Sequence, residues 1–139
     1  MTRDQSPIPG SPECYSSIYS RAQSEAELLV EREVYGANVG VRGYTTIAQA
    51  DALAARLDLR QGMRLLDIGA GRGWPGLYLA QKSGCEAVLT DLPPAAPRSA
   101  LARARRQRLD GRCSFVVASA THLPFRPQTF DAVVHTDTL

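Results

Sequence analysis

The chain has 139 residues, 44% of them hydrophobic, and a formal net charge of +2. This length fits one domain, and the hydrophobic content suffices for a packed core. The small net charge argues against nucleic acid and against an anionic membrane surface as partners. No apolar run reaches the length of about 20 residues that a membrane-spanning helix needs. We therefore expect a globular domain without membrane segments.

The cysteines and histidines indicate the compartment. Cys14, Cys85 and Cys113 are far apart and form no CxxC pair. This spacing argues against a disulfide framework and favours a reducing compartment. His122 and His135 do not complete a zinc site with these cysteines, so no metal is expected. The N-terminus also lacks the apolar core of a signal peptide, and the sequence therefore predicts a cytoplasmic protein.

The composition divides the chain into three segments. Residues 1–16 are rich in proline and serine, which bury too little apolar surface to order themselves, so a flexible leader is predicted there. Residues 17–61 show helical patterns, and residues 62–139 alternate between strand and helix patterns. We expect the last segment to be the main domain.

Two capping boxes predict where the helices of residues 17–61 begin. Ser24 is followed three residues later by Glu27, and Thr46 is followed in the same way by Gln49. Gly36 is predicted to end the first of these helices. Apolar residues on one helical face follow the second box.

Short apolar runs alternate with helical patterns in the last segment. Strands are predicted at residues 63–68, 87–90, 114–118 and 131–135, and helices at residues 75–83 and 97–109. Proline begins each of these helices, and glycine is predicted to end each, at Gly84 and Gly111. The alternation predicts an α/β fold, a doubly wound, Rossmann-like parallel sheet.

A glycine-rich turn follows the first strand, in the sequence LLDIGAGRG over residues 65–73. Asp67 precedes glycines at positions 69, 71 and 73. Glycine lets the backbone turn sharply and lets a ligand approach the main chain. Because ligands of such sheets bind at the carboxyl ends of the strands, this turn is the first candidate binding site.

Two cofactors fit this turn. Residues 71–76 also satisfy the dinucleotide pattern GxGxxG, so a nicotinamide-dependent oxidoreductase is an alternative. In that pattern the first glycine directly follows the strand, whereas Gly69 and Ala70 intervene here. A pyrophosphate would also meet negative charge at Asp67, but a sulfonium cofactor with a free amino group would find a partner there. The register therefore favours S-adenosylmethionine.

Asp91 ends the second strand, 20 residues after Gly71. A carboxylate at this position accepts hydrogen bonds from ribose hydroxyls in either cofactor. The structural alternative is a loop cap beside Pro93 and Pro94. Asp91 thus indicates a nucleoside ligand without choosing between the two cofactors.

Four motifs together carry a family resemblance. LLDIGAGRG, VLTD, LPF and FDAVV occur in this order within residues 62–139, and YGANVGVRGYTT precedes them. The chain resembles the class I S-adenosylmethionine-dependent methyltransferases, in the branch that mostly methylates small molecules. The resemblance implies S-adenosylmethionine as cofactor, a small-molecule methyl acceptor and the strand order 3-2-1-4. Since the family's sheet has further strands, it also implies a domain truncated after the fourth strand, and an inactive cofactor-binding fragment is a third alternative.

The resemblance also implies which residues bind the cofactor. They belong to the N-terminal covering segment, the glycine turn and the ends of the strands: Tyr44, Asp67, Gly69, Ala70, Gly71, Asp91, Leu92, Ser119, Ala120 and His135. The first strand and turn would hold the methionine part, and Asp91 the ribose. Leu92 would lie against the adenine, with Ser119 and Ala120 at its edge. The family commonly has an acid at the position of Ser119, so an uncharged hydroxyl predicts a weaker contact.

The end of the fourth strand bears on the acceptor. The sequence there is His-Thr-Asp-Thr over residues 135–138, without the (Asn/Asp)-Pro-Pro-aromatic motif of enzymes that methylate base or glutamine amino groups. This difference favours a small metabolite. His135 would begin the loop beside the methyl group. A general base would come from His135 or Asp137, and no catalytic residue is assigned.

Overall fold

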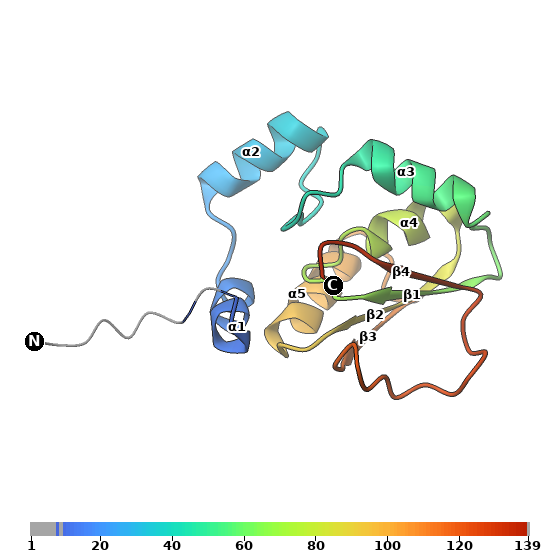
Figure 1. The fold of residues 1–139 in the computed structure, drawn as a ribbon. Coiled ribbons are helices and arrows are strands. Elements are labelled where there is room, and N and C mark those ends of the chain that lie inside the picture. The colour runs from blue at the N-terminus through green and yellow to red at the C-terminus, as the bar shows by residue number, and fades with distance from the viewer. Residues whose placement is uncertain (1–7, 9, 139) are drawn as a thin grey trace, which may run out of the picture.

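A computed structural model describes residue 8 and residues 10–138 of the chain (Figure 1). The described residues form helices and one sheet, in the order α1 (Pro12–Ser20), α2 (Glu25–Tyr35), α3 (Ile47–Arg56), β1 (Arg64–Ile68), α4 (Gly76–Ser83), β2 (Glu86–Asp91), α5 (Ala95–Arg106), β3 (Cys113–Val117) and β4 (Ala132–His135). The strands are parallel and lie in the order β3-β2-β1-β4, as predicted. Among the described helices, none is long and apolar enough to cross a membrane.

The strand β1 is central and positions the site. It pairs with β2 on one side and with β4 on the other, so that Ile68 is level with both Thr90 and His135. The carboxyl ends of these strands therefore meet at one edge of the sheet. Helices α4 and α5 pack on the sheet, and α3 packs on α4 (Figure 1). Among the described residues, 118–131 connect β3 to β4 without a helix.

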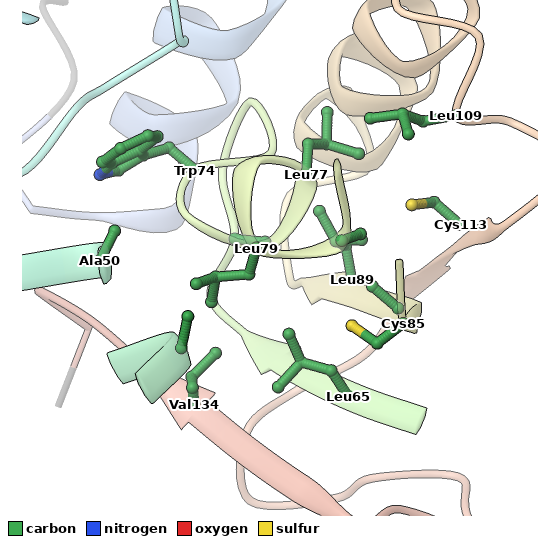
Figure 2. Close-up of a cluster of buried hydrophobic side chains, with 14 of the residues drawn as sticks. Ala50, Leu65, Trp74, Leu77, Leu79, Cys85, Leu89, Leu109, Cys113 and Val134 are labelled. Atoms are coloured by element: carbon green, nitrogen blue, oxygen red, sulfur yellow. The ribbon is translucent and has the colours of Figure 1, made fainter. Parts of the chain in front are cut away.

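The core lies between the sheet and the helices. Leu65 and Val134 project from β1 and β4 toward Leu79 of α4, and Leu77 lies near Leu89 of β2 (Figure 2). All five side chains are buried. Burial of each such side chain contributes about 1.5–3 kcal/mol, which explains why the apolar runs of the sequence located the strands correctly.

The two predicted capping boxes are present. The Ser24 side chain accepts a hydrogen bond from the backbone amide of Glu27, and the Thr46 side chain accepts one from that of Gln49. The side chains of Glu27 and Gln49 in turn accept from the backbone amides of Ser24 and Thr46. Gly36 ends α2 with a left-handed φ of 70°. These local signals are sufficient to define helix ends without tertiary contacts.

Two predicted boundaries are wrong. A helix begins at Pro12, inside the predicted leader, because Ser11 caps it through the Cys14 amide at 3.2 Å and proline fits the first turn. Residues 1–7 of that leader lie outside the described residues. Helix α5 ends at Arg106, before the predicted end at Leu109, and Gly111 is not its stop. Arg108 has the left-handed φ of 58°, which turns the chain back and buries Leu109.

Candidate functional site

A cavity of about 320 Å³ lies at the carboxyl ends of β1, β2 and β4. Its walls also include α1 and the loop 36–46, which connects α2 to α3. The cavity is lined by Gly10, Pro12, Tyr15, Tyr19, Gly40, Arg42, Gly43, Gly69, Ala70, Gly71, Arg72, Trp74, Asp91, Leu92, Pro93, Thr136, Asp137 and Thr138. Five predicted site residues are among them, from the glycine turn and the end of β2.

The turn after β1, residues 69–73, is here called the glycine loop. Gly69 and Gly71 have φ values of 73° and 53°, a region that favours glycine. The amides of Gly69 and Ala70 both donate to the carbonyl of Thr90, at 2.8 and 3.0 Å, which fastens the loop to the end of β2. A Cβ on Gly71 would lie only 2.9 Å from the Tyr19 hydroxyl. The absence of side chains thus leaves the loop backbone open to the cavity.

Asp91 lies in the wall of the cavity and is bonded to the glycine loop. One carboxylate oxygen accepts from the Gly71 amide and the other from the Leu92 amide, each at 2.8 Å. Partial burial raises the pKa of Asp91 above its ordinary value. Each oxygen keeps a further lone pair, so the carboxylate can organise the loop and still accept from a ligand.

Asp67 lies beneath the glycine loop and does not line the cavity. Its side chain is 0% exposed, and Oδ2 accepts from the Gly76 amide at 2.8 Å, at the start of α4. Oδ1 is buried without a hydrogen-bond partner among the described residues. Burial raises the pKa of Asp67 well above its usual value. The structure therefore gives Asp67 a supporting position, one layer away from the predicted contact with the cofactor.

Four other predicted residues do not line the cavity. Tyr44 is 89% exposed, and His135 is exposed at the end of β4. Ser119 bonds Thr121 at 2.9 Å, in the turn where Ala120 follows it. That turn still starts beside the site, because the Ala118 amide donates to the carbonyl of Asp91 at 3.1 Å.

Asp137, the other candidate base, holds the loop 36–46. Its Oδ2 accepts from the amides of Tyr44 and Thr45 at 2.9 and 3.2 Å and from the Thr45 hydroxyl at 3.0 Å. The Trp74 indole donates to the Thr45 carbonyl at 3.0 Å. Oδ2 of Asp137 is therefore engaged by three donors, which gives this side chain a structural role in the loop 36–46.

Sequence reasoning missed the aromatic and basic walls of the cavity. Tyr15 and Tyr19 of α1 and Arg42 and Arg72 line it. Burial, and then the nearby Asp91, raise the pKa of Tyr19 to about 12, so its hydroxyl is a neutral donor. The signal was present as two tyrosines four residues apart after a Ser-Pro cap, a spacing that places both on one helical face.

The comparisons with known proteins agree with this geometry. Residues 65–139 match the family described as a methyltransferase domain. The chain is 35% identical over 83 residues to methyltransferase GfsG of Streptomyces halstedii, which covers 60% of this chain and 30% of the relative. It is 36% identical over 85 residues to erythromycin 3''-O-methyltransferase of Saccharopolyspora erythraea, which covers 60% and 28%.

A solved structure is similar over more of the chain. The (4+2)-cyclase SpnF is 26% identical with a TM-score of 0.63, over 91% of this chain and 49% of that one. The chain thus spans less than a third of the length of these two curated relatives and about half of that structure. Since the family match covers more than half of this chain, the chain belongs to the methyltransferase domain family, as its motifs and its 3-2-1-4 sheet indicated.

Proposed function

We propose that this chain binds S-adenosylmethionine in the cavity above the glycine loop and serves methyl transfer to a small-molecule acceptor. The observation that carries the proposal is Asp91, a half-buried carboxylate bonded to the Gly71 amide in the wall of that cavity. The family match supports the same cofactor.

The residues present fit this cofactor. The cavity of about 320 Å³ lies within the range of about 300–1,000 Å³ that small-molecule sites usually have. Side chains at Gly69 and Gly71 would collide with Thr138 and Tyr19, so the open backbone depends on glycine. The backbone of residues 69–71 would hold the methionine part, Asp91 the ribose hydroxyls, and the exposed Leu92 one face of the adenine.

The cofactor supplies a methyl group on a positively charged sulfur. The chain would hold the donor in one orientation and keep water away from it. Positioning of reactants alone contributes roughly 7–11 kcal/mol to such reactions. No side chain is assigned as general base, because His135 does not line the cavity and Asp137 holds the Thr45 backbone.

The acceptor is proposed to be a small molecule. The name of the relative from Saccharopolyspora erythraea describes an O-methyltransferase that acts on erythromycin, a small molecule. The end of β4 also lacks the motif of enzymes that methylate base or glutamine amino groups. A cytoplasmic location is part of the same proposal, since Cys14, Cys85 and Cys113 are all free.

A second candidate function follows from the likeness to SpnF, whose name describes a cyclase. A methyltransferase fold can host other chemistry, because function depends on the site and not on the fold. In that case the cofactor site would be kept and methyl transfer would be absent. The oxidoreductase alternative loses its support, because the family that matches is a methyltransferase family.

Calorimetric titration tests the cofactor. S-adenosylhomocysteine is expected to bind with a saturable heat and NAD is not. The matched control is Gly71→Val, which places a branched side chain against Tyr19 at a φ of 53° and should abolish binding without unfolding the core. Tighter binding of NAD would overturn the proposal. Methyl transfer from S-adenosylmethionine, measured with candidate acceptors, then separates the methyltransferase from the cyclase.

A further inference from the structure

Arg72 has an environment that the function above does not explain. It lies between Gly71 and Gly73 of the glycine loop, yet its residue surface is only 3% exposed. Its Nη2 donates to the carbonyl of Ile18 at 2.9 Å and to that of Arg21 at 3.0 Å. Both carbonyls are at the C-terminal end of α1, where Arg21 is the C-cap. One arginine thus joins the glycine loop to the end of a helix 51 residues earlier in the chain.

Burying this charge is costly, and burial lowers the pKa of Arg72. Among the described residues, no carboxylate lies within ion-pair distance of its guanidinium. The free carbonyls of a helix C-terminus carry partial negative charge and compensate a cation there. The ring of Tyr19 adds a cation–π contact, with its centroid 5.8 Å from Arg72 Cζ. The position of Arg72 therefore depends on α1 being in place.

The position of α1 in turn shapes the cavity. Tyr15 and Tyr19 of this helix line it, and the Tyr19 hydroxyl faces the backbone of Gly71. If α1 separated from the loop, the cavity would lose this wall, and the Arg72 charge would lose both of its acceptors. The same loop backbone is where the methionine part of the cofactor is expected.

We propose that Arg72 is a positioning residue that docks α1, with the Tyr19 hydroxyl, onto the glycine loop, so that ligand binding and docking of α1 stabilise each other. The coupling rests on the proposed cofactor site, whereas the docking does not. Coupling between two events is reciprocal, so a ligand that needs the Tyr19 wall must also hold α1 in place.

Limited trypsin digestion reads out the docking directly. The carbonyl of Arg21 accepts from Arg72, so docked α1 holds the backbone at the exposed Arg21–Ala22 bond in one conformation, and a protease must displace it to cleave there. The rate of cleavage at this bond is measured from the mass of the released fragment. We expect this rate to rise about tenfold or more in Arg72→Ala, because the variant loses hydrogen bonds to a charged group. The matched control is Arg105→Ala, which removes an exposed arginine of α5. Equal cleavage in the wild type and Arg72→Ala would overturn the docking.

Ligand dependence tests the coupling. S-adenosylhomocysteine is expected to slow cleavage after Arg21 in the wild type but not in Arg72→Ala, and to bind that variant about tenfold more weakly, within the usual range of coupling between sites. Arg72→Lys keeps one charged donor, so its cleavage rate and its affinity should lie between those of the wild type and Arg72→Ala. A variant that is merely misfolded would not show these intermediate values. Tyr19→Phe should weaken ligand binding while leaving ligand-free cleavage unchanged. Unchanged affinity in Arg72→Ala would overturn the coupling.

The two proposals fail in different ways. If the wild type does not bind S-adenosylhomocysteine, the proposed function fails, and the ligand-free digestion still decides whether Arg72 docks α1. If Arg72→Ala does not fold, as judged by its melting curve, Arg72→Lys carries the digestion experiment and Tyr19→Phe carries the affinity measurement. A wild-type cleavage rate in Arg72→Lys, together with wild-type affinity in Tyr19→Phe, would then overturn the proposal.

Discussion

Two carboxylates at the ends of neighbouring strands have different surroundings. Asp67 is fully buried below the glycine loop and bonds the first amide of α4. Asp91 is half-buried in the wall of the cavity and bonds the loop itself. Burial raises the pKa of both. We therefore propose that Asp67 supports the loop and that Asp91 contacts the ligand.

The buried carboxyl of Asp67 makes stability depend on pH. Because its pKa is raised on folding, the folded chain holds this proton more tightly than the unfolded chain. Its contribution to the free energy of unfolding is thus fully present below the ordinary aspartate pKa of about 4 and is lost as the pH rises through the raised value. The Asp67→Asn side chain can still accept from the Gly76 amide but carries no titrating group. This variant should therefore not lose stability as the pH rises, and it should be more stable than the wild type at neutral pH.

Urea unfolding at several pH values checks this expectation. Asp91 is present in both the wild type and Asp67→Asn, so the difference in their free energies of unfolding reports mainly on Asp67. This difference should grow as the pH rises from about 4 toward neutrality. Parallel curves for the two proteins would show that Asp67 does not titrate in this way.

Substitution of Asp91 should reduce affinity for the ligand. Asp91→Ala removes the proposed ribose acceptor and also frees the Gly71 amide, so S-adenosylhomocysteine binding should weaken by on the order of 1–3 kcal/mol. Asp91→Asn keeps one acceptor oxygen and should lose less. The matched control is Asp110→Ala, an exposed aspartate after α5. Unchanged affinity in a folded Asp91→Ala protein would remove this residue from the site.

At the scale of elements, buried polar contacts hold the N-terminal helices and the loop 36–46 on the domain. Arg103 of α5 donates to the carbonyl of Asn38 at 2.5 Å and to the Gln23 side chain at 3.2 Å. The buried carboxylate of Glu31 accepts from the Gly40 amide at 3.0 Å. Each bond reaches a backbone or side chain of another element. Together they hold α2 and the loop 36–46 in place, in addition to the apolar packing of Val39 and Val41 on the core.

Asp137 completes this attachment, and its loss should free the loop locally. In Asp137→Ala the amides of Tyr44 and Thr45 lose their acceptor, so their hydrogen exchange should accelerate by at least about tenfold. Asp137→Asn retains an acceptor oxygen and should exchange nearly as the wild type does. The opposite pattern, with unchanged exchange in both variants and turnover abolished in Asp137→Asn, would indicate a general base.

At the scale of the whole molecule, the sequence predicted what depends on local pattern. The strands, the glycine loop and the position of Asp91 follow from apolar runs, glycines and spacing, and the strand order follows from the family resemblance. The helix α1 was missed because the proline- and serine-rich composition outweighed its local signals, the Ser11 cap and Pro12. Its attachment to the glycine loop through Arg72, across 51 residues, is a contact that no local pattern contains. The exposure of Tyr44 was missed for a similar reason, since Asp137 determines how that backbone turns.

The position of the ligand is the central claim, and an amide NMR titration tests it most directly. On addition of S-adenosylhomocysteine, saturable shifts are predicted for Gly69, Ala70, Gly71 and Leu92, and for the indole of Trp74, the single tryptophan of the chain. Amides of the exposed face of α3 should stay unchanged and serve as the internal control. Saturable shifts confined to other parts of the chain, with the glycine loop and Leu92 unmoved, would contradict the account.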